Sequence, residues 1–96
     1  MAVMRDIQDR RDEILRLAAG HGARNVRVFG SVVRGEADAT SDVDLLIELD
    51  PDRSLLDRIA LMHDLEDLLG CKVDVVNANA LHWTVRDRIL AEGVPL

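Results

Sequence analysis

The sequence predicts a single α/β (α+β) domain over residues 1–96, with a small mixed β-sheet of about three strands covered by helices. Apolar residues recur alternately at helical and at strand spacing, which predicts the element order α-β-α-β-α-β-α. A length of 96 residues, 48% of them hydrophobic, suits one core near the lower end of the sizes that fold unaided. No repeat, low-complexity segment or proline-rich linker divides the chain, so we expect one sheet and its covering helices.

The first part of the chain predicts a helix, a strand and a tight turn. Apolar residues recur at three- and four-residue steps from residue 4 to residue 19, as in an amphipathic helix that Gly20 ends. Arg24 to Phe29 alternates and is rich in β-branched residues, which predicts a strand. A turn or short helix is expected to start at Ser31, and a polar loop to span Glu36 to Ser41.

The middle of the chain predicts a buried strand followed by a capped helix. Asp42 to Leu49 is apolar enough for an interior strand. Ser54 can cap a helix from Leu55 to Leu69, and Gly70 ends it. The apolar stripe of this helix comprises Leu55, Leu56, Ile59, Met62, Leu65, Leu68 and Leu69.

The last part of the chain predicts one more strand and one more helix. Lys72 to Asn77 alternates as a strand, and Leu81 to Glu92 follows as a helix. Val85, Ile89 and Leu90 are expected to face inward from this final helix.

Composition and charge exclude several classes of protein. The formal net charge of −6 disfavours direct nucleic-acid binding, because phosphate backbones attract basic surfaces. Cys71 is the only cysteine, so no disulfide within the chain and no CxxC site can form, which favours a reducing, cytoplasmic setting. The longest apolar runs are four residues, so we expect no membrane span.

Three aspartates predict a site for a divalent cation. Asp42 and Asp44 are two residues apart in a predicted strand, so their carboxylates lie on one face about 7 Å apart. Asp74 stands between two valines that are expected to be buried in the next strand. A carboxylate in so apolar a strand costs free energy, which suggests that it has a function. Oxygen ligands of this kind suit Mg²⁺, whose shell nucleotide phosphates and water complete. The competing interpretation is that an Asp-x-Asp pair merely solvates a loop.

A glycine and a serine predict where a phosphate would bind beside those carboxylates. Gly30 and Ser31 follow the first strand, where glycine allows close backbone approach and amides with a hydroxyl can hold a phosphate. Arg34 lies one turn later, within reach of the same anion. Together these residues predict a metal-bridged triphosphate site.

The segment GSVVRGEADATSDVDLLIEL, from Gly30 to Leu49, resembles the minimal nucleotidyltransferases of the DNA polymerase beta-like superfamily. The hallmark of that family is Gly-Ser, ten further residues, and Asp-x-Asp, with a third acid in a later strand that Asp74 matches. The closing VRDRILAEGVPL also looks like the end of these small proteins. The particular resemblance is to the antitoxin members that pair with HEPN ribonuclease toxins.

The resemblance implies the nucleotidyltransferase fold and an enzyme that uses ATP and two Mg²⁺ ions to transfer AMP to an acceptor hydroxyl. In the antitoxin branch that acceptor is a tyrosine of the toxin, with which the chain would form a complex. By carry-over, Asp42 and Asp44 hold metal, Asp74 holds metal or helps deprotonate the acceptor, and Gly30 and Ser31 hold the triphosphate. Arg34 is added as a nucleotide-binding residue from its spacing alone.

Two other functions compete with this one. The same site could transfer a nucleotide to an RNA end or a small molecule, although acidity and short length disfavour that. A non-catalytic chain could instead neutralise a toxin by binding alone, although such a chain has no need of three converging carboxylates.

Core packing is expected for both aromatic residues, Phe29 and Trp83, with partner binding as the alternative for Trp83.

Overall fold

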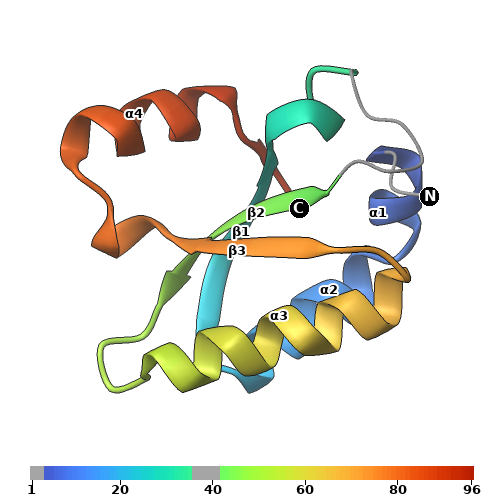
Figure 1. Ribbon diagram of the computed structural model, residues 1–96, viewed down its shortest axis with the longest axis horizontal. Coiled ribbons are helices and arrows are strands. Elements are labelled where there is room, and N and C mark those ends of the chain that lie inside the picture. Colours follow the sequence, from blue (N-terminus) through green and yellow to red (C-terminus); the bar gives the residue numbers. More distant parts are fainter. Residues whose placement is uncertain (1–3, 36–41) are drawn as a thin grey trace.

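The protein is a mixed four-stranded sheet with helices on both faces (Figure 1). The computed structural model describes residues 4–35 and 42–96, so the loop expected over Glu36 to Ser41 lies outside the described residues. The strands are β1 (Ala23–Phe29), β2 (Val43–Leu49), β3 (Val73–Asn77) and β4 (Val94–Pro95). The helices are α1 (Met4–Asp9), α2 (Arg11–Gly20), α3 (Leu55–Leu69) and α4 (Trp83–Glu92), with short 3₁₀ turns η1 (Gly30–Val32) and η2 (Ala78–Ala80).

The sheet has the order β3-β2-β1-β4, so β2 is an interior strand as predicted. β1 and β2 are antiparallel, and β2 and β3 are parallel, joined by the crossover helix α3. The expectation of about three strands misses β4, which pairs antiparallel with the free edge of β1. Two residues, Val94 and Pro95, are too few to show a periodic pattern, so only their pairing with β1 identifies this strand.

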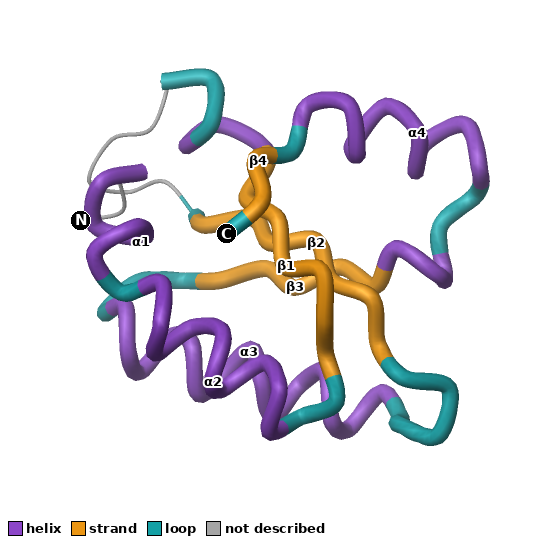
Figure 2. The backbone as a smooth tube through the Cα atoms, turned by 180° about the vertical axis from the view of Figure 1, so that it is seen from behind, coloured by secondary structure: helices purple, strands orange, loops and turns teal. Residues whose placement is uncertain are grey.

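One face of the sheet forms the hydrophobic core beneath α2 and α3, which lie side by side (Figure 2). Alternate strand residues point into this core because successive side chains point to opposite faces of a sheet. The strand residues in the core are Val26, Val28, Val43, Leu45, Ile47, Leu49, Val73 and Val75. Ile14 and Ala18 of α2 and Leu61 and Leu65 of α3 complete it from the helices. The opposite face is thereby left for polar residues and α4.

The helix predicted over residues 4–19 is two helices. Arg10 separates α1 from α2 with a non-helical conformation (φ −106°, ψ 17°). Ile7 and Ile14 are nevertheless both buried, so the apolar spacing continues across the break and conceals it from the sequence. The final helix begins at Trp83 rather than Leu81, because the side chain of His82 accepts the backbone N–H of Thr84 and caps it.

Several apolar side chains expected in the core are exposed instead. Trp83 is 68% exposed, so core packing does not explain it. On α3, Leu55, Leu56 and Ile59 are also exposed, while only Leu61 and Leu65 are fully buried. Val85, Ile89 and Leu90 of α4 are half-buried. Helical spacing indicates which residues share a face, but the tertiary structure decides how much of that face is covered.

No helix in the described ranges 4–35 and 42–96 has the length and hydrophobicity to cross a membrane.

The helix α3 begins and ends where its sequence predicts. The side-chain oxygen of Ser54 accepts the backbone N–H of Leu56, and the Asp57 carboxylate accepts the backbone N–H of Ser54 at 3.0 Å. This hydrogen bond to Ser54 is the main cause that lowers the pKa of Asp57 below its usual range. Gly70 ends the helix in the left-handed conformation (φ 68°) that glycine adopts without strain.

We predict that Ser54→Ala lowers the free energy of unfolding by about 1 kcal/mol, because the first turn of α3 loses a hydrogen-bond acceptor. Ser54→Asn is the matched control, since asparagine caps helices about as well as serine and should change stability by only a few tenths of that amount. Urea unfolding measures both variants. Equal stabilities of the alanine and asparagine variants would contradict the role of this cap.

Candidate active site

The end of β1 and the starts of β2 and β3 meet at one edge of the sheet. Because β1 and β2 are antiparallel, Phe29 at the end of β1 is the partner of Asp44 near the start of β2. Because β2 and β3 are parallel, Asp44 is in turn the partner of Asp74. Gly30 and Ser31 follow directly in η1. The register therefore brings together residues that are 44 positions apart in the sequence, from Gly30 to Asp74 (Figure 1).

Two of the predicted acids, Asp44 and Asp74, share the face of the sheet opposite the core, whereas Asp42 lies just before β2, which begins at Val43 and not at Asp42 as expected. Val43 and Val73 are buried on the core side, so Asp44 and Asp74, the next residue in each strand, point the other way. Asp42 precedes Asp44 by two residues, and its charge acts on Asp44. Asp44 is half-buried, whereas Asp74 is exposed on the edge strand. Val73 and Val75 are buried on the core side of β3 and Asp74 lies between them on the other side, as the alternation of this strand predicts.

Crowded negative charge characterises this site. Burial raises the pKa of the Asp44 carboxyl above its ordinary value of 3.8, and the charges of Asp74 and Asp42 raise it further. Arg34 acts in the opposite direction, and Glu92 adds to the repulsion. Within residues 4–35 and 42–96, no three His, Cys, Asp or Glu side chains are arranged as a ready metal-binding group. The carboxylates thus line one face as neighbours, and their oxygen atoms are the donors that Mg²⁺ prefers.

Gly30 allows the backbone to approach the Asp44 side chain closely. It has a φ of 79°, and a Cβ at this position would collide with Oδ2 of Asp44. The predicted turn at Ser31 is confirmed as η1, in which the backbone carbonyl of Gly30 accepts the N–H of Arg34 at 3.2 Å. The half-buried Ser31 therefore lies on a tight turn, next to the glycine that approaches Asp44.

The side chain of Arg34, which follows this turn, contacts a residue near the C-terminus of the chain. Its Nη1 atom donates to Oε1 of Glu92, the last residue of α4, at 2.6 Å. Sequence reasoning missed Glu92 as a residue of this site. The only signal was its place in the closing segment VRDRILAEGVPL, and helical spacing could not show that it meets Arg34.

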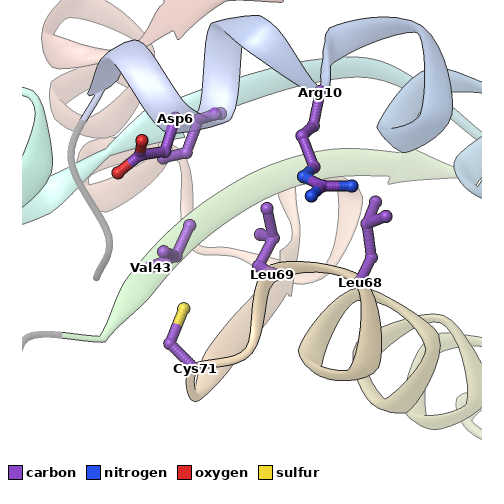
Figure 3. A pocket seen from close by; sticks show the side chains of 7 residues that line it. Asp6, Arg10, Val43, Leu68, Leu69 and Cys71 are labelled. Carbon is purple, nitrogen blue, oxygen red and sulfur yellow. The ribbon is translucent and has the colours of Figure 1, made fainter.

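A cavity of about 280 Å³ lies near the same edge but on the core side of the sheet (Figure 3). Arg10, between α1 and α2, and Cys71, after α3, point into it from opposite sides. Val43, Leu68 and Leu69 supply its apolar wall. None of the predicted site residues lines this cavity.

Comparison with known proteins identifies the family. The family model described as nucleotidyltransferase domain matches residues 11–96. The chain belongs to the nucleotidyltransferase domain family. MJ0435 of Methanocaldococcus jannaschii, a candidate protein adenylyltransferase, is 39% identical over 89 residues, which are 93% of this chain and 96% of that protein. The protein adenylyltransferase MntA of Thermococcus cleftensis is 45% identical over 73 residues, 76% of this chain and 74% of MntA.

Solved structures confirm the nucleotidyltransferase fold. The structure of a candidate minimal nucleotidyltransferase superposes with a TM-score of 0.89 at 45% identity, over 99% of this chain and 97% of the other. A toxin-antitoxin complex with AMP-PNP contains a chain with a TM-score of 0.76 at 20% identity, covering 88% of this chain and 69% of that one. A complex of tri-AMPylated Shewanella oneidensis HEPN toxin with MNT antitoxin gives 0.70 at 18%, covering 92% and 69%. The last two comparisons show a shared fold.

We predict that Asp44→Asn stabilises this nucleotidyltransferase domain at pH 7 in the absence of divalent cations. The pKa of Asp44 is raised in the folded state, so its ionised form opposes folding at neutral pH. The gain should be under about 1 kcal/mol, because the side chain is partly open to solvent. It should shrink as pH falls through the folded-state pKa and vanish below the ordinary value of 3.8, where the wild-type carboxyl is protonated in both states.

Urea unfolding between pH 7 and that lower limit measures the gain. Asp67→Asn, which removes the same charge from an exposed position on α3, is the control and should not reproduce it. Destabilisation by Asp44→Asn at pH 7 would indicate instead that Asp44 is a hydrogen-bonded structural acid.

Proposed function

We propose that this protein is a magnesium-dependent protein adenylyltransferase that transfers AMP from ATP to a tyrosine hydroxyl of a HEPN ribonuclease toxin, and so acts as its antitoxin. The observation that carries the proposal is the register of β2, which places Asp44 beside Asp74 and against Gly30 at one sheet edge. Membership of the nucleotidyltransferase family and 45% identity to an MntA adenylyltransferase support the same activity.

Each residue of the site has a proposed role in the transfer. Gly30 and Ser31 bind the triphosphate through the turn after β1, and Arg34 binds it with its guanidinium group. Asp42, Asp44 and Asp74 are the ligands proposed for two Mg²⁺ ions, which when bound would stabilise the attacking and leaving oxygens of an in-line displacement. Asp74, which is exposed on the edge strand, is also proposed to accept the proton of the acceptor hydroxyl.

The proposed transfer needs no nucleophile from this chain, because the acceptor oxygen is the nucleophile. The acceptor oxygen forms a bond to the α-phosphorus of ATP, the bond from that phosphorus to the bridging oxygen breaks, and pyrophosphate leaves. The chain's residues therefore orient the triphosphate, hold charge near the reacting oxygens and remove one proton. The neighbouring carboxylates of Asp44 and Asp74 and the turn at Gly30 and Ser31 support such a mechanism.

A folded partner is the proposed source of the acceptor. Asp74 is exposed, so a hydroxyl presented by another protein can approach it from solvent. The net charge of −6 favours basic partners, and a ribonuclease needs a basic surface to bind RNA. A solved complex that contains a chain with the same fold as this protein joins an MNT antitoxin to an AMPylated HEPN toxin, and it supports this class of partner.

We predict that ATP and Mg²⁺ bind cooperatively, because phosphate oxygens complete a metal shell that the protein carboxylates only begin. Isothermal calorimetry with ATP, with and without magnesium, measures this coupling. Asp42→Asn combined with Asp44→Asn should reduce affinity for MgATP at least tenfold, since charged contacts of this kind are worth roughly 1.5–3 kcal/mol each. Asp67→Asn, on the far side of the sheet on α3, should bind like the wild type. Tight ATP binding that is indifferent both to chelator and to the double substitution would rule out the proposed site.

We predict that the wild-type protein adds AMP, once or a small number of times, to a tyrosine of its cognate HEPN toxin when MgATP is present. Asp44→Asn should abolish the addition while leaving the fold intact, because it removes a metal ligand from the surface of the sheet. Intact-mass and peptide mass spectrometry measure the modification, and a ribonuclease assay measures toxin activity. Equal inhibition of an unmodified toxin by the wild type and by Asp44→Asn would indicate neutralisation by binding alone. Modification of RNA or a small molecule in place of the toxin would indicate a different acceptor.

A further inference from the structure

A second cavity, of about 160 Å³, lies between α4 and the face of the sheet opposite the core. The residues on either side of Arg27 in β1 point into the core, so Arg27 points to this opposite face and lines the cavity. Leu46 also lines it and shares its face with Asp44, two residues earlier in β2. The register pairs Arg27 with Leu46 and Phe29 with Asp44, so the cavity lies about 7 Å along the strands from the candidate active site.

Apolar side chains form much of the wall of this cavity. Leu46 and Ala78 are fully buried, yet neither belongs to the hydrophobic core on the other face of the sheet. Leu90 lines the cavity from α4. An inorganic anion would face these three apolar side chains and is a poor match for them. An apolar cavity of about 150 Å³ can hold a benzene ring, so this one has room for the six-membered ring of a flat ligand.

Arg86 of α4 lines the same cavity and has a hydrogen-bond donor without an acceptor. Its Nε atom is the one buried side-chain nitrogen or oxygen within residues 4–35 and 42–96 that makes no hydrogen bond. Buried donors in native proteins are almost always paired, so this N–H group indicates that a water molecule or a ligand completes it.

Glu48 supplies an acceptor beside that donor. Its Oε1 atom is 3.9 Å from Nη2 of Arg86, which is too long for a hydrogen bond, and Asn25 donates to the other oxygen, Oε2. The side chain of Arg86 is 40% exposed and that of Glu48 is 26% exposed, so a ligand can reach both from solvent. The cavity therefore offers a hydrogen-bond donor and an acceptor next to an apolar wall.

This combination matches the edge of an adenine base. Adenine presents an acceptor, the ring nitrogen N7, next to a donor, its exocyclic amino group. The Nε–H group of Arg86 can donate to a ring nitrogen, and Oε1 of Glu48 can accept from the amino group. The flat ring would then pack against Leu46 and Leu90.

We propose that this cavity binds the adenine base of ATP, with Arg86 and Glu48 as the residues that recognise its edge. This inference rests on the proposed function, because it adds a site for the base to the triphosphate site proposed at Gly30 and Ser31. The two sites follow each other along one face of the sheet, in the order in which the phosphates and the base are joined in ATP.

Calorimetry with MgATP and with magnesium tripolyphosphate, which lacks the nucleoside, tests this site. The wild type should bind MgATP at least tenfold more tightly than magnesium tripolyphosphate. Arg86→Met keeps an unbranched side chain but removes the guanidinium group, so it should weaken MgATP binding about tenfold and leave tripolyphosphate binding unchanged. Arg88→Met, at an exposed position of the same helix, is the matched control and should bind both ligands like the wild type.

The outcomes separate this inference from the proposed function. If the wild type binds neither ligand, the proposed function fails. If the wild type binds both ligands equally well, or if Arg86→Met binds MgATP like the wild type, the adenine site is wrong and the proposed function stands. A water molecule alone on Nε of Arg86 would give this result. Equal loss of both ligands in Arg86→Met would also overturn the adenine site, because Arg86 would then act on the triphosphate or on the fold.

A spectroscopic measurement locates the base without any substitution. In the wild-type protein labelled on its leucine methyl groups and saturated with MgATP, the adenine protons H2 or H8 should give nuclear Overhauser effects to Leu46 and Leu90. Leu56, which is exposed on α3, is the internal control and should give none. Absence of these effects at both Leu46 and Leu90 would show that the base lies elsewhere and would overturn the inference.

Discussion

The register of β2 against both of its neighbours is the constraint on which the site depends. It places Asp44 beside Asp74 on one side and opposite Phe29, just before Gly30, on the other. A slip of one residue would turn the carboxylates into the core and the valines into solvent. Val43 and Val73 are fully buried on the opposite face, so the hydrophobic core enforces the register that the polar face needs. One face of these strands therefore packs into the core, and the opposite face carries the candidate site.

Charge in the site and stability of the fold oppose each other. Carboxylates gathered at the sheet edge repel one another, and partial burial makes the ionised form of Asp44 more costly still, which is why its pKa is raised. Arg34 offsets part of this repulsion and forms an ion pair with Glu92. The repulsion among these carboxylates lowers the stability of the protein. In the proposed function, the same concentration of negative charge would give this end of the sheet its affinity for divalent cations.

The C-terminal segment is held by polar and backbone contacts more than by the core. No residue of α4 is fully buried. An ion pair joins Glu92 to Arg34, a longer one of 3.9 Å joins Arg86 to Glu48, and β4 pairs with β1. A helix attached in this way keeps its place because its end is tied to the sheet, and its last residue therefore reaches the candidate active site.

The sequence by itself determined the features whose causes are local. Alternation predicts β1, β2 and β3, the Ser54 cap and Gly70 mark the ends of α3, and the spacing of Gly30, Ser31, Asp42 and Asp44 predicts which residues to examine as a site. Only the tertiary structure decided the break at Arg10, the exposure of Trp83, the strand β4 and the contact of Glu92 with Arg34. Each of these depends on which distant segment lies alongside, and no periodicity within a segment records its neighbour across the fold.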